Sequence, residues 1–282
     1  MKTSFYTSLF GDRTLREVAD FAASAGYDAI EVDFRRHAQD PARLDAVAEA
    51  VRARGIELCA VTVFGNQLDP DQTARDTLRA STRAIVDGAK ALGIPAVVLF
   101  PGRNATRPEA EDYADIAAYL MELAEAGGGT RILMENWPGA TKNYVATTPA
   151  GWDRLFALVT RPEVGLEFDP SHLIWQGIDP AAAFASYVGR VGMLHAKDTE
   201  IRTADLQRQG YLGTGWWSYR LPGRGQLNWG QFLSGVAATG FDGVISVEHE
   251  DSDFGWREGP LERRREGLEI ALRAIKSGWP NP

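Results

Sequence analysis

Short β-rich runs alternate with helical patterns along the whole 282-residue chain, and this alternation is the feature that most constrains its fold. Alternation without a long block of strands predicts a parallel sheet whose strands are joined by helices. Eight such units are the number that closes a (β/α)8 barrel, for which about 250 residues are typical. We therefore predict an α/β chain that forms a single (β/α)8 TIM barrel over residues 1–282. The strands are expected to begin near Ser4, Asp28, Ile56, Pro95, Arg131, Val164, Arg190 and Gly243.

Local capping signals support the helices between these strands. Thr14 and Glu17 have the spacing of a capping box, and Gly26 is placed to end the helix that they begin. Thr148 and Pro149 combine a capping side chain with a first-turn proline, which predicts another helix start.

One connection is much longer than the others. Residues 198–227 follow the seventh strand and are rich in Gly, Arg and Trp. Long loops at this position of a barrel are usually functional, so we predict an extended loop after strand seven beside the active site.

Composition and charge argue against several classes of function. The chain has 30 Lys and Arg against 38 Asp and Glu, and the net charge of −8 disfavours a nucleic-acid or anionic-membrane binder. Cys59 is the one cysteine, which excludes an internal disulfide and suits a reducing cytosol. The sequence has no signal-peptide pattern and no run near the ~18 apolar residues of a membrane span. We expect a cytoplasmic protein.

Polar side chains end the last four predicted strands. They are Glu135, Asp169, His195 and Glu248, and the active site of such a barrel lies at these strand ends, so the four should meet at one height. Three carboxylates without a cation would repel one another in a pocket of low dielectric constant, and a divalent metal removes that conflict. Each residue alone could instead be a helix cap, an ion-pair partner or a core histidine, so the metal interpretation rests on all four.

The donor set indicates which cofactor to expect. Oxygen ligands with one imidazole suit Mn²⁺, which we expect, and Mg²⁺, Co²⁺ and Zn²⁺ are alternatives. No organic cofactor is expected.

The strand ends as a group resemble the xylose isomerase-like TIM-barrel superfamily. Its members include ketose 3-epimerases, hydroxypyruvate isomerase, and inosose isomerases and dehydratases. The resemblance implies that Glu135, Asp169, His195 and Glu248 are metal ligands and that His172 contacts the substrate. The stretches 195–200, 216–225 and 248–251 look more like the inosose-processing and keto-glycoside-cleaving branches than like ketose 3-epimerases. The matching runs are Met-Glu135-Asn, Phe-Asp169-Pro-Ser-His172, Leu-His195-Ala-Lys-Asp and Val-Glu248-His.

Further substrate contacts are predicted around the same mouth. Lys197 lies two residues past His195 and should point to the same face, where it could protonate a leaving oxygen or form a structural ion pair. Tryptophans after the strand ends could stack on a sugar ring or lie in a subunit interface. Arg224 could clamp substrate oxygens or be solvated. The predicted substrate-binding residues are His172, Lys197, Arg224, Glu31, Trp137 and Trp217.

The predicted function is that of a divalent-metal-dependent sugar or polyol isomerase or epimerase. Glu135 and Glu248 would be its bases, abstracting and returning a proton next to a carbonyl through a metal-stabilised enediolate. The alternative is a dehydratase or lyase with the same metal site, either inosose dehydratase-like or cleaving a 3-keto-glycoside or C-glycoside. An apurinic endonuclease-like DNA repair enzyme is a further alternative, disfavoured because those enzymes use a histidine-rich three-zinc cluster and this chain has four histidines.

The predicted partners follow from the same residues. We expect a small, unphosphorylated sugar, inosose or keto-glycoside, because Glu250, Asp251 and Asp253 follow strand eight where many barrels bind a phosphate. No nucleic-acid or membrane partner is expected. A homo-oligomer is expected, with a hetero-complex, in which the chain would be a metal-bearing subunit without its own turnover, as the alternative.

Overall fold

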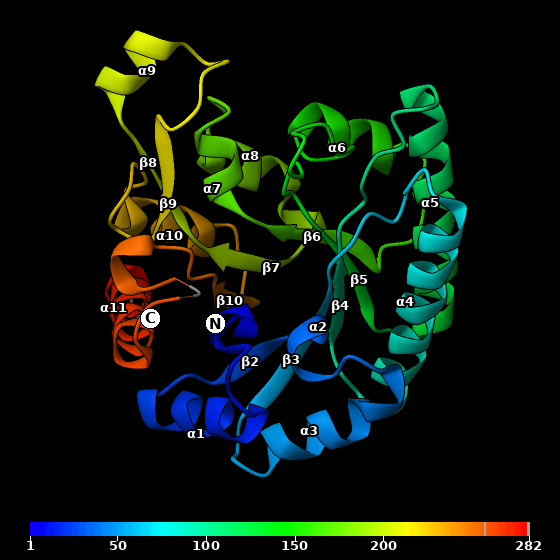
Figure 1. The fold of residues 1–282 in the computed structure, drawn as a ribbon, viewed down its shortest axis with the longest axis horizontal. Helices are drawn as coiled ribbons and strands as arrows, with labels where there is room; N and C mark the ends of the chain where they lie inside the picture. Colours follow the sequence, from blue (N-terminus) through cyan, green and yellow to red (C-terminus); the bar gives the residue numbers. More distant parts are fainter. Residues whose placement is uncertain (257, 281–282) are drawn as a thin grey trace.

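Within residues 1–256 and 258–280, which the computed structural model describes, eight parallel strands form a barrel that is surrounded by helices (Figure 1). The strand order is β1-β10-β7-β6-β5-β4-β3-β2, and a parallel bridge between Tyr6 and Glu31 joins the two ends of this sheet. The predicted (β/α)8 TIM barrel is confirmed. The strands are β1 Lys2–Phe5, β2 Ala29–Asp33, β3 Glu57–Val63, β4 Ala96–Leu99, β5 Arg131–Glu135, β6 Val164–Phe168, β7 Val191–Ala196 and β10 Val244–Val247.

Each barrel strand begins within two residues of its predicted start. The eighth strand of the barrel is β10 because two short strands, β8 Asp198–Ile201 and β9 Trp217–Arg220, precede it in the chain. They form a separate antiparallel pair.

The helices begin and end where the capping residues predict. Thr14 and Glu17 form the complete capping box of α1, and Gly26 ends that helix in the left-handed conformation, which glycine adopts without strain. Thr148 caps α6 through the backbone N–H of Gly151. The helices are α1 Leu15–Ala25, α2 Phe34–His37, α3 Leu44–Arg52, α4 Gln72–Leu92, α5 Glu109–Gly127, α6 Pro149–Phe156, α7 Pro170–Ile174, α8 Pro180–Tyr187, α9 Thr203–Gln209, α10 Trp229–Ala238 and α11 Leu261–Gly278, with 3₁₀ turns η1 Thr7–Phe10, η2 Pro41–Arg43, η3 Val188–Arg190 and η4 Ser252–Phe254.

Alternation along each strand divides the apolar residues between two layers. In β5, Ile132 and Met134 pack outward against the helices, whereas Leu133 packs in a small cluster inside the barrel. The side chains therefore have a period of two, and Glu135 belongs with Leu133 on the inner face. The apolar inner cluster comprises Ala29, Cys59, Ala60, Ala96, Val98, Leu133 and Met193.

The extended connection predicted after β7 is present, and it contains secondary structure of its own. Its strands β8 and β9 pair in antiparallel fashion, and α9 lies between them in the chain (yellow in Figure 1). We call residues 198–220 the arm. Strand pairing joins its two ends, residues 198–201 and 217–220, and the Gly- and Trp-rich sequence did not reveal this pairing.

Among the described residues, no helix combines the length and the apolar character that crossing a membrane requires.

The buried side chain of Trp152 allows a test of the packing between the barrel strands and the surrounding helices. Its side chain is fully buried, and its ring lies 5.9 Å from that of Phe168 and 5.0 Å from that of Tyr187. We expect Trp152→Ala to lower the free energy of unfolding by ~3–5 kcal/mol, because loss of the indole would leave a cavity beside Phe168 in β6. Urea denaturation measures this, and Leu158→Ala, at a half-exposed position, is the control, with a change of about 0.5 kcal/mol or less.

Candidate metal and substrate site

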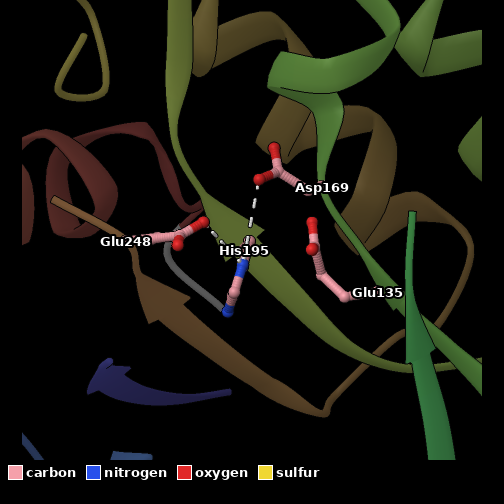
Figure 2. A group of neighbouring side chains, drawn as sticks. All are labelled: Glu135, Asp169, His195 and Glu248. Atoms are coloured by element: carbon pink, nitrogen blue, oxygen red, sulfur yellow. Dashed lines mark ion pairs between the residues drawn. The ribbon is translucent and has the colours of Figure 1, made fainter. Parts of the chain in front are cut away.

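Four neighbouring strands bring Glu135, Asp169, His195 and Glu248 together. Each residue offers one ligand atom, and these atoms all lie within 4.8 Å of one another. Figure 2 shows the four side chains pointing toward a common centre, from the ends of β5, β6, β7 and β10. Three of the residues are buried, and Glu248 is nearly so.

Asp169 is held by its neighbours so that one oxygen remains for the centre. The side chain of Asn136 donates to the backbone carbonyl of Asp169 at 2.9 Å and accepts from its backbone N–H at 2.7 Å. Asp169 Oδ1 caps α7 by accepting from the N–H of Ser171 at 2.7 Å. Its other oxygen, Oδ2, faces His195 and Lys197.

His195 connects this centre to a polar layer deeper in the barrel. Its Nε2 lies 3.0 Å from Glu31 Oε2 and 3.3 Å from Glu167 Oε1, whereas Nδ1 lies 3.3 Å from Glu248 Oε2. Glu31 also accepts hydrogen bonds from the hydroxyls of Thr62 and Ser246. A proton on Nε2 donated to Glu31 leaves the lone pair of Nδ1 facing the centre, as a metal-ligating histidine requires.

Lys197 supplies positive charge to the centre. Its buried Nζ lies 3.0 Å from Asp169 Oδ2 and 3.3 Å from Glu250 Oε2, and it also contacts Glu248. These three carboxylates raise the pKa of Lys197 above its ordinary value, although burial acts in the opposite direction.

The pKa values of the buried carboxyl groups shift in different directions. Burial and the charge of Asp169 raise the pKa of Glu135 well above its usual range. Burial opposes ionisation of Glu248 as well, but the Lys197 ammonium outweighs it and lowers the pKa of Glu248 to about 2. Beneath them, burial and the charge of Glu31 raise the pKa of Glu167 to about 8. The cluster has more acidic groups than one ammonium can compensate.

The atoms that face the centre fit a divalent cation. Glu135 Oε1, Asp169 Oδ2 and His195 Nδ1 are buried, and in the part of the chain that the structure describes they form no hydrogen bond of good geometry. Buried polar atoms without such partners are rare, and a cation bound by these three atoms would satisfy them. Carboxylate oxygens with one imidazole suit Mn²⁺, Mg²⁺ and Co²⁺, and Zn²⁺ also accepts them.

A cavity of about 350 Å³ opens above this centre. One wall is aromatic: the ring of Phe64 lies 5.1 Å from that of Phe100 and 5.3 Å from that of Trp137. Such a wall suits the apolar face of a sugar ring, and the floor offers polar groups for its hydroxyls. The lining residues are Tyr6, Ser8, Arg35, Phe64, Phe100, Glu135, Trp137, His172, Lys197, Tyr219, Glu248, Glu250 and Trp256.

Three of the six predicted substrate contacts line this cavity, namely Trp137, His172 and Lys197. His172 lies beside the centre, with Nε2 3.0 Å from Glu135 Oε1. Burial and the nearby Lys197 charge lower the pKa of His172 to about 4, so the imidazole is neutral near pH 7.

The other three predicted substrate contacts, Trp217, Arg224 and Glu31, are not among the described residues that line this cavity. Trp217 stacks on Trp175 with ring centroids 5.0 Å apart. Arg224 forms ion pairs with Asp251 and Asp253, at 3.2 and 3.3 Å. Glu31 lies under His195 as described above. Their contact with a substrate stays a prediction that the observed contacts do not favour.

The sequence-based interpretation assigned no role to Glu167 or Tyr219, and it used Glu250 only as a charge that disfavours a phosphate. Glu250 and Glu167 each lie two residues from a predicted ligand, so the period-two rule could have placed them on the inner face. Tyr219 reaches the cavity from the arm, and only the folded path of that insertion reveals it.

Comparisons with known proteins agree with this geometry. The model of the xylose isomerase-like TIM barrel family matches residues 19–276. The chain is 27% identical to the uncharacterized protein YfiH of Bacillus subtilis (strain 168), over 89% of this chain and 93% of that protein. It is 32% identical to an inosose dehydratase of Lacticaseibacillus casei over 36% of each chain. A D-tagatose 3-epimerase-like protein has a similar fold, with a TM-score of 0.75, 20% identity and coverage of 98% and 99% of the two chains.

The contact between Glu31 and His195 predicts an effect on metal affinity. Glu31→Gln keeps the shape of the side chain but removes the charge that orients His195, so we expect Mn²⁺ to bind 10–100-fold more weakly, as is typical when such a supporting carboxylate is lost. Isothermal titration calorimetry of the metal-stripped protein measures this affinity. Ser246→Ala, which removes one hydrogen bond to Glu31 but keeps its carboxylate, should have a smaller effect; unchanged affinity in Glu31→Gln would contradict the interpretation.

Proposed function

The chain belongs to the xylose isomerase-like TIM barrel family, and from this premise we propose that it is a divalent-metal-dependent isomerase or epimerase of an unphosphorylated sugar or polyol. The observation that carries the proposal is the pair Glu135 and Glu248, which line the same cavity from strands separated by β6 and β7. Their carboxylates approach the centre from different sides, as abstraction and return of a proton on opposite faces of one carbon requires.

The cation would be held by Glu135, Asp169, His195 and Glu248. When bound, it would supply Lewis-acid chemistry that stabilises negative charge on substrate oxygens. Mn²⁺ is the proposed ion, with Mg²⁺, Co²⁺ and Zn²⁺ as alternatives.

The two glutamates are the proposed bases. One would remove the proton next to the carbonyl and the other would return a proton from the opposite side, a type of catalysis that typically contributes ~10²–10⁴-fold. Each must keep one oxygen free of the metal to act as a base. His172 and Lys197, whose Nε2 and Nζ lie 3.4 Å apart beside this pair, would bind substrate hydroxyls.

Charge pairing around the cavity supports a neutral substrate. The guanidinium of Arg35 lies over the ring of Phe64, and its Nη2 lies 3.4 Å from Asp33 Oδ2. The ammonium of Lys197 contacts Asp169, Glu248 and Glu250. Both of the Lys and Arg side chains that line the described cavity are therefore ion-paired, and a phosphate would meet the carboxylate of Glu250.

The second candidate is a dehydratase or lyase acting through the same proton abstraction. Lys197 and His172 favour it, because the Lys197 ammonium could protonate a departing oxygen and the neutral His172 imidazole could donate a hydrogen bond to it. The partial match to an inosose dehydratase points the same way. The two candidates differ only in the fate of a hydroxyl or glycosidic oxygen next to the carbanion.

Metal removal tests the cofactor. We expect chelation to abolish turnover and Mn²⁺, Mg²⁺ or Co²⁺ to restore it, since the carboxylates cannot stabilise the developing charge themselves. Asp169→Ala and His195→Ala should each lose bound metal, measured by elemental analysis of the purified proteins. Full activity in a metal-stripped sample would contradict the proposal.

Proton NMR of candidate sugars and inososes in D₂O tests the reaction. The metal-loaded enzyme should place deuterium on the carbon next to the carbonyl, whereas loss of a hydroxyl or of an aglycone would select the second candidate. Glu135→Gln and Glu248→Gln should each lower net epimerisation by ~10²-fold or more, because each removes one base. With two opposed bases, one variant should still exchange deuterium from one epimer and not from the other.

A matched control is Glu122→Gln, a carboxylate that pairs with Arg83 on the outer surface of the barrel. Its turnover and exchange should equal those of the unaltered protein. Substantial net epimerisation in both active-site variants with metal bound would show that the bases are other groups.

A further inference from the structure

The arm carries a side chain into the cavity. Tyr219 lies in β9, yet it lines the cavity together with residues from the barrel strands. Its hydroxyl oxygen lies 2.7 Å from Nδ1 of His172, and the two rings meet edge to face at 5.2 Å. His172 belongs to α7, which follows directly on Asp169.

Several contacts fix the arm against α7 and the end of β10. The hydroxyl of Thr199 in β8 donates to the backbone carbonyl of Ser171 at 2.8 Å. Arg220, next to Tyr219, binds Glu200 at 2.7 Å and Asp251 at 2.9 Å. The arm is thereby tied to the helix that bears His172 and to the segment that follows Glu248.

Alternation in β9 directs two aromatic rings to the same side. Trp217 and Tyr219 are two residues apart and therefore share a face of the pair. Trp217 stacks on Trp175, directly after α7, while Tyr219 reaches His172 within it. The ring of Tyr219 also lies 4.4 Å from the ammonium of Lys197, within reach of a cation–π interaction.

We propose that Tyr219 is a positioning residue through which the inserted arm orients His172 for the reaction. The Nε2 atom of His172 lies 3.0 Å from Glu135 Oε1 and 3.3 Å from Asp169 Oδ2, which are acceptors, and 3.4 Å from the Lys197 ammonium, which is a donor. Because both carboxylate oxygens are nearer than the ammonium, we assign the ring proton to Nε2. Nδ1 then accepts from the Tyr219 hydroxyl. This bond fixes both the tautomer and the ring plane, and Nε2–H is directed at the centre where the substrate binds.

This inference rests on the proposed function only for its effect on turnover. The tautomer and the contact with Tyr219 are properties of the protein without substrate. They can therefore be tested even if no substrate has been identified.

Nitrogen-15 NMR of histidine-labelled protein at neutral pH tests the tautomer. The chain has four histidines, His37, His172, His195 and His249, so His172→Gln identifies the signals of His172 by their loss. We expect His172 to carry its proton on Nε2, with Nδ1 as a hydrogen-bonded acceptor. Tyr219→Phe keeps the ring and removes the hydroxyl, and it should move the Nδ1 signal toward that of a free or mixed tautomer.

The kinetic test uses the same variant with the holoenzyme. Tyr219→Phe should lower kcat by about tenfold or more with a smaller change in KM, because a misdirected group loses much of its effect over small displacements. In a His172→Gln background the same substitution should cause no further loss, since its effect passes through His172. Tyr211→Phe is the matched control: this tyrosine lies on the same arm and is exposed, and neither the NMR signals nor kcat should change.

Three results would overturn the proposal. The first is a His172 ring with its proton on Nδ1 in the unaltered protein. The second is an unchanged His172 spectrum in Tyr219→Phe. The third is an equal loss of kcat from Tyr219→Phe with and without His172, which would indicate a general effect on the arm. Failure of deuterium exchange for every sugar tested would contradict the proposed function but leave the NMR result standing.

Discussion

Like charge buried at one end of the barrel is the constraint on which the site depends. Glu135, Asp169 and Glu248 lie around one centre, and two unit charges ~4 Å apart repel by ~4 kcal/mol at the effective dielectric constant of a protein interior. Lys197 forms ion pairs with Asp169 and Glu248. Burial and the charge of Asp169 raise the pKa of Glu135, although the Lys197 charge acts in the opposite direction. A divalent cation at the centre would satisfy all three carboxylates at once.

Apolar and polar side chains occupy successive layers along the axis of the barrel. The lower interior is filled by small and medium apolar side chains. Above them, Glu31 and Glu167 face Nε2 of His195, and above His195 lie the carboxylates of the centre. One imidazole thus separates two acidic layers, and its orientation depends on the lower layer as much as on the upper. This is why a side chain that lies outside the cavity is expected to control metal affinity.

The strand ends could be predicted from the sequence because they follow from local rules. The period of two in β5 and the strand–helix alternation suffice to place Glu135 on the inner face at the C-terminal end of a strand. The contacts that these side chains form with residues distant in the sequence could not be predicted in the same way. Glu31 binds His195 from across the barrel, and Tyr219 reaches His172 from an arm whose antiparallel pairing leaves no distinctive local signal. Arg224 lies in a Gly- and Arg-rich stretch that could hold substrate oxygens, but its guanidinium forms ion pairs with Asp251 and Asp253 instead.

The proposed isomerase and its lyase alternative place different demands on the same cavity. Both need the carboxylates at the strand ends, so those residues cannot distinguish them. Elimination additionally needs a group that protonates the departing oxygen or donates a hydrogen bond to it. The candidates are the Lys197 ammonium and the neutral His172 imidazole, whose Nζ and Nε2 atoms lie 3.4 Å apart. Tyr219 contacts both, through a hydrogen bond to His172 and its ring face to Lys197. Under either proposal the barrel would provide the proton abstraction that the two reactions share, and the arm would act on the groups by which they differ.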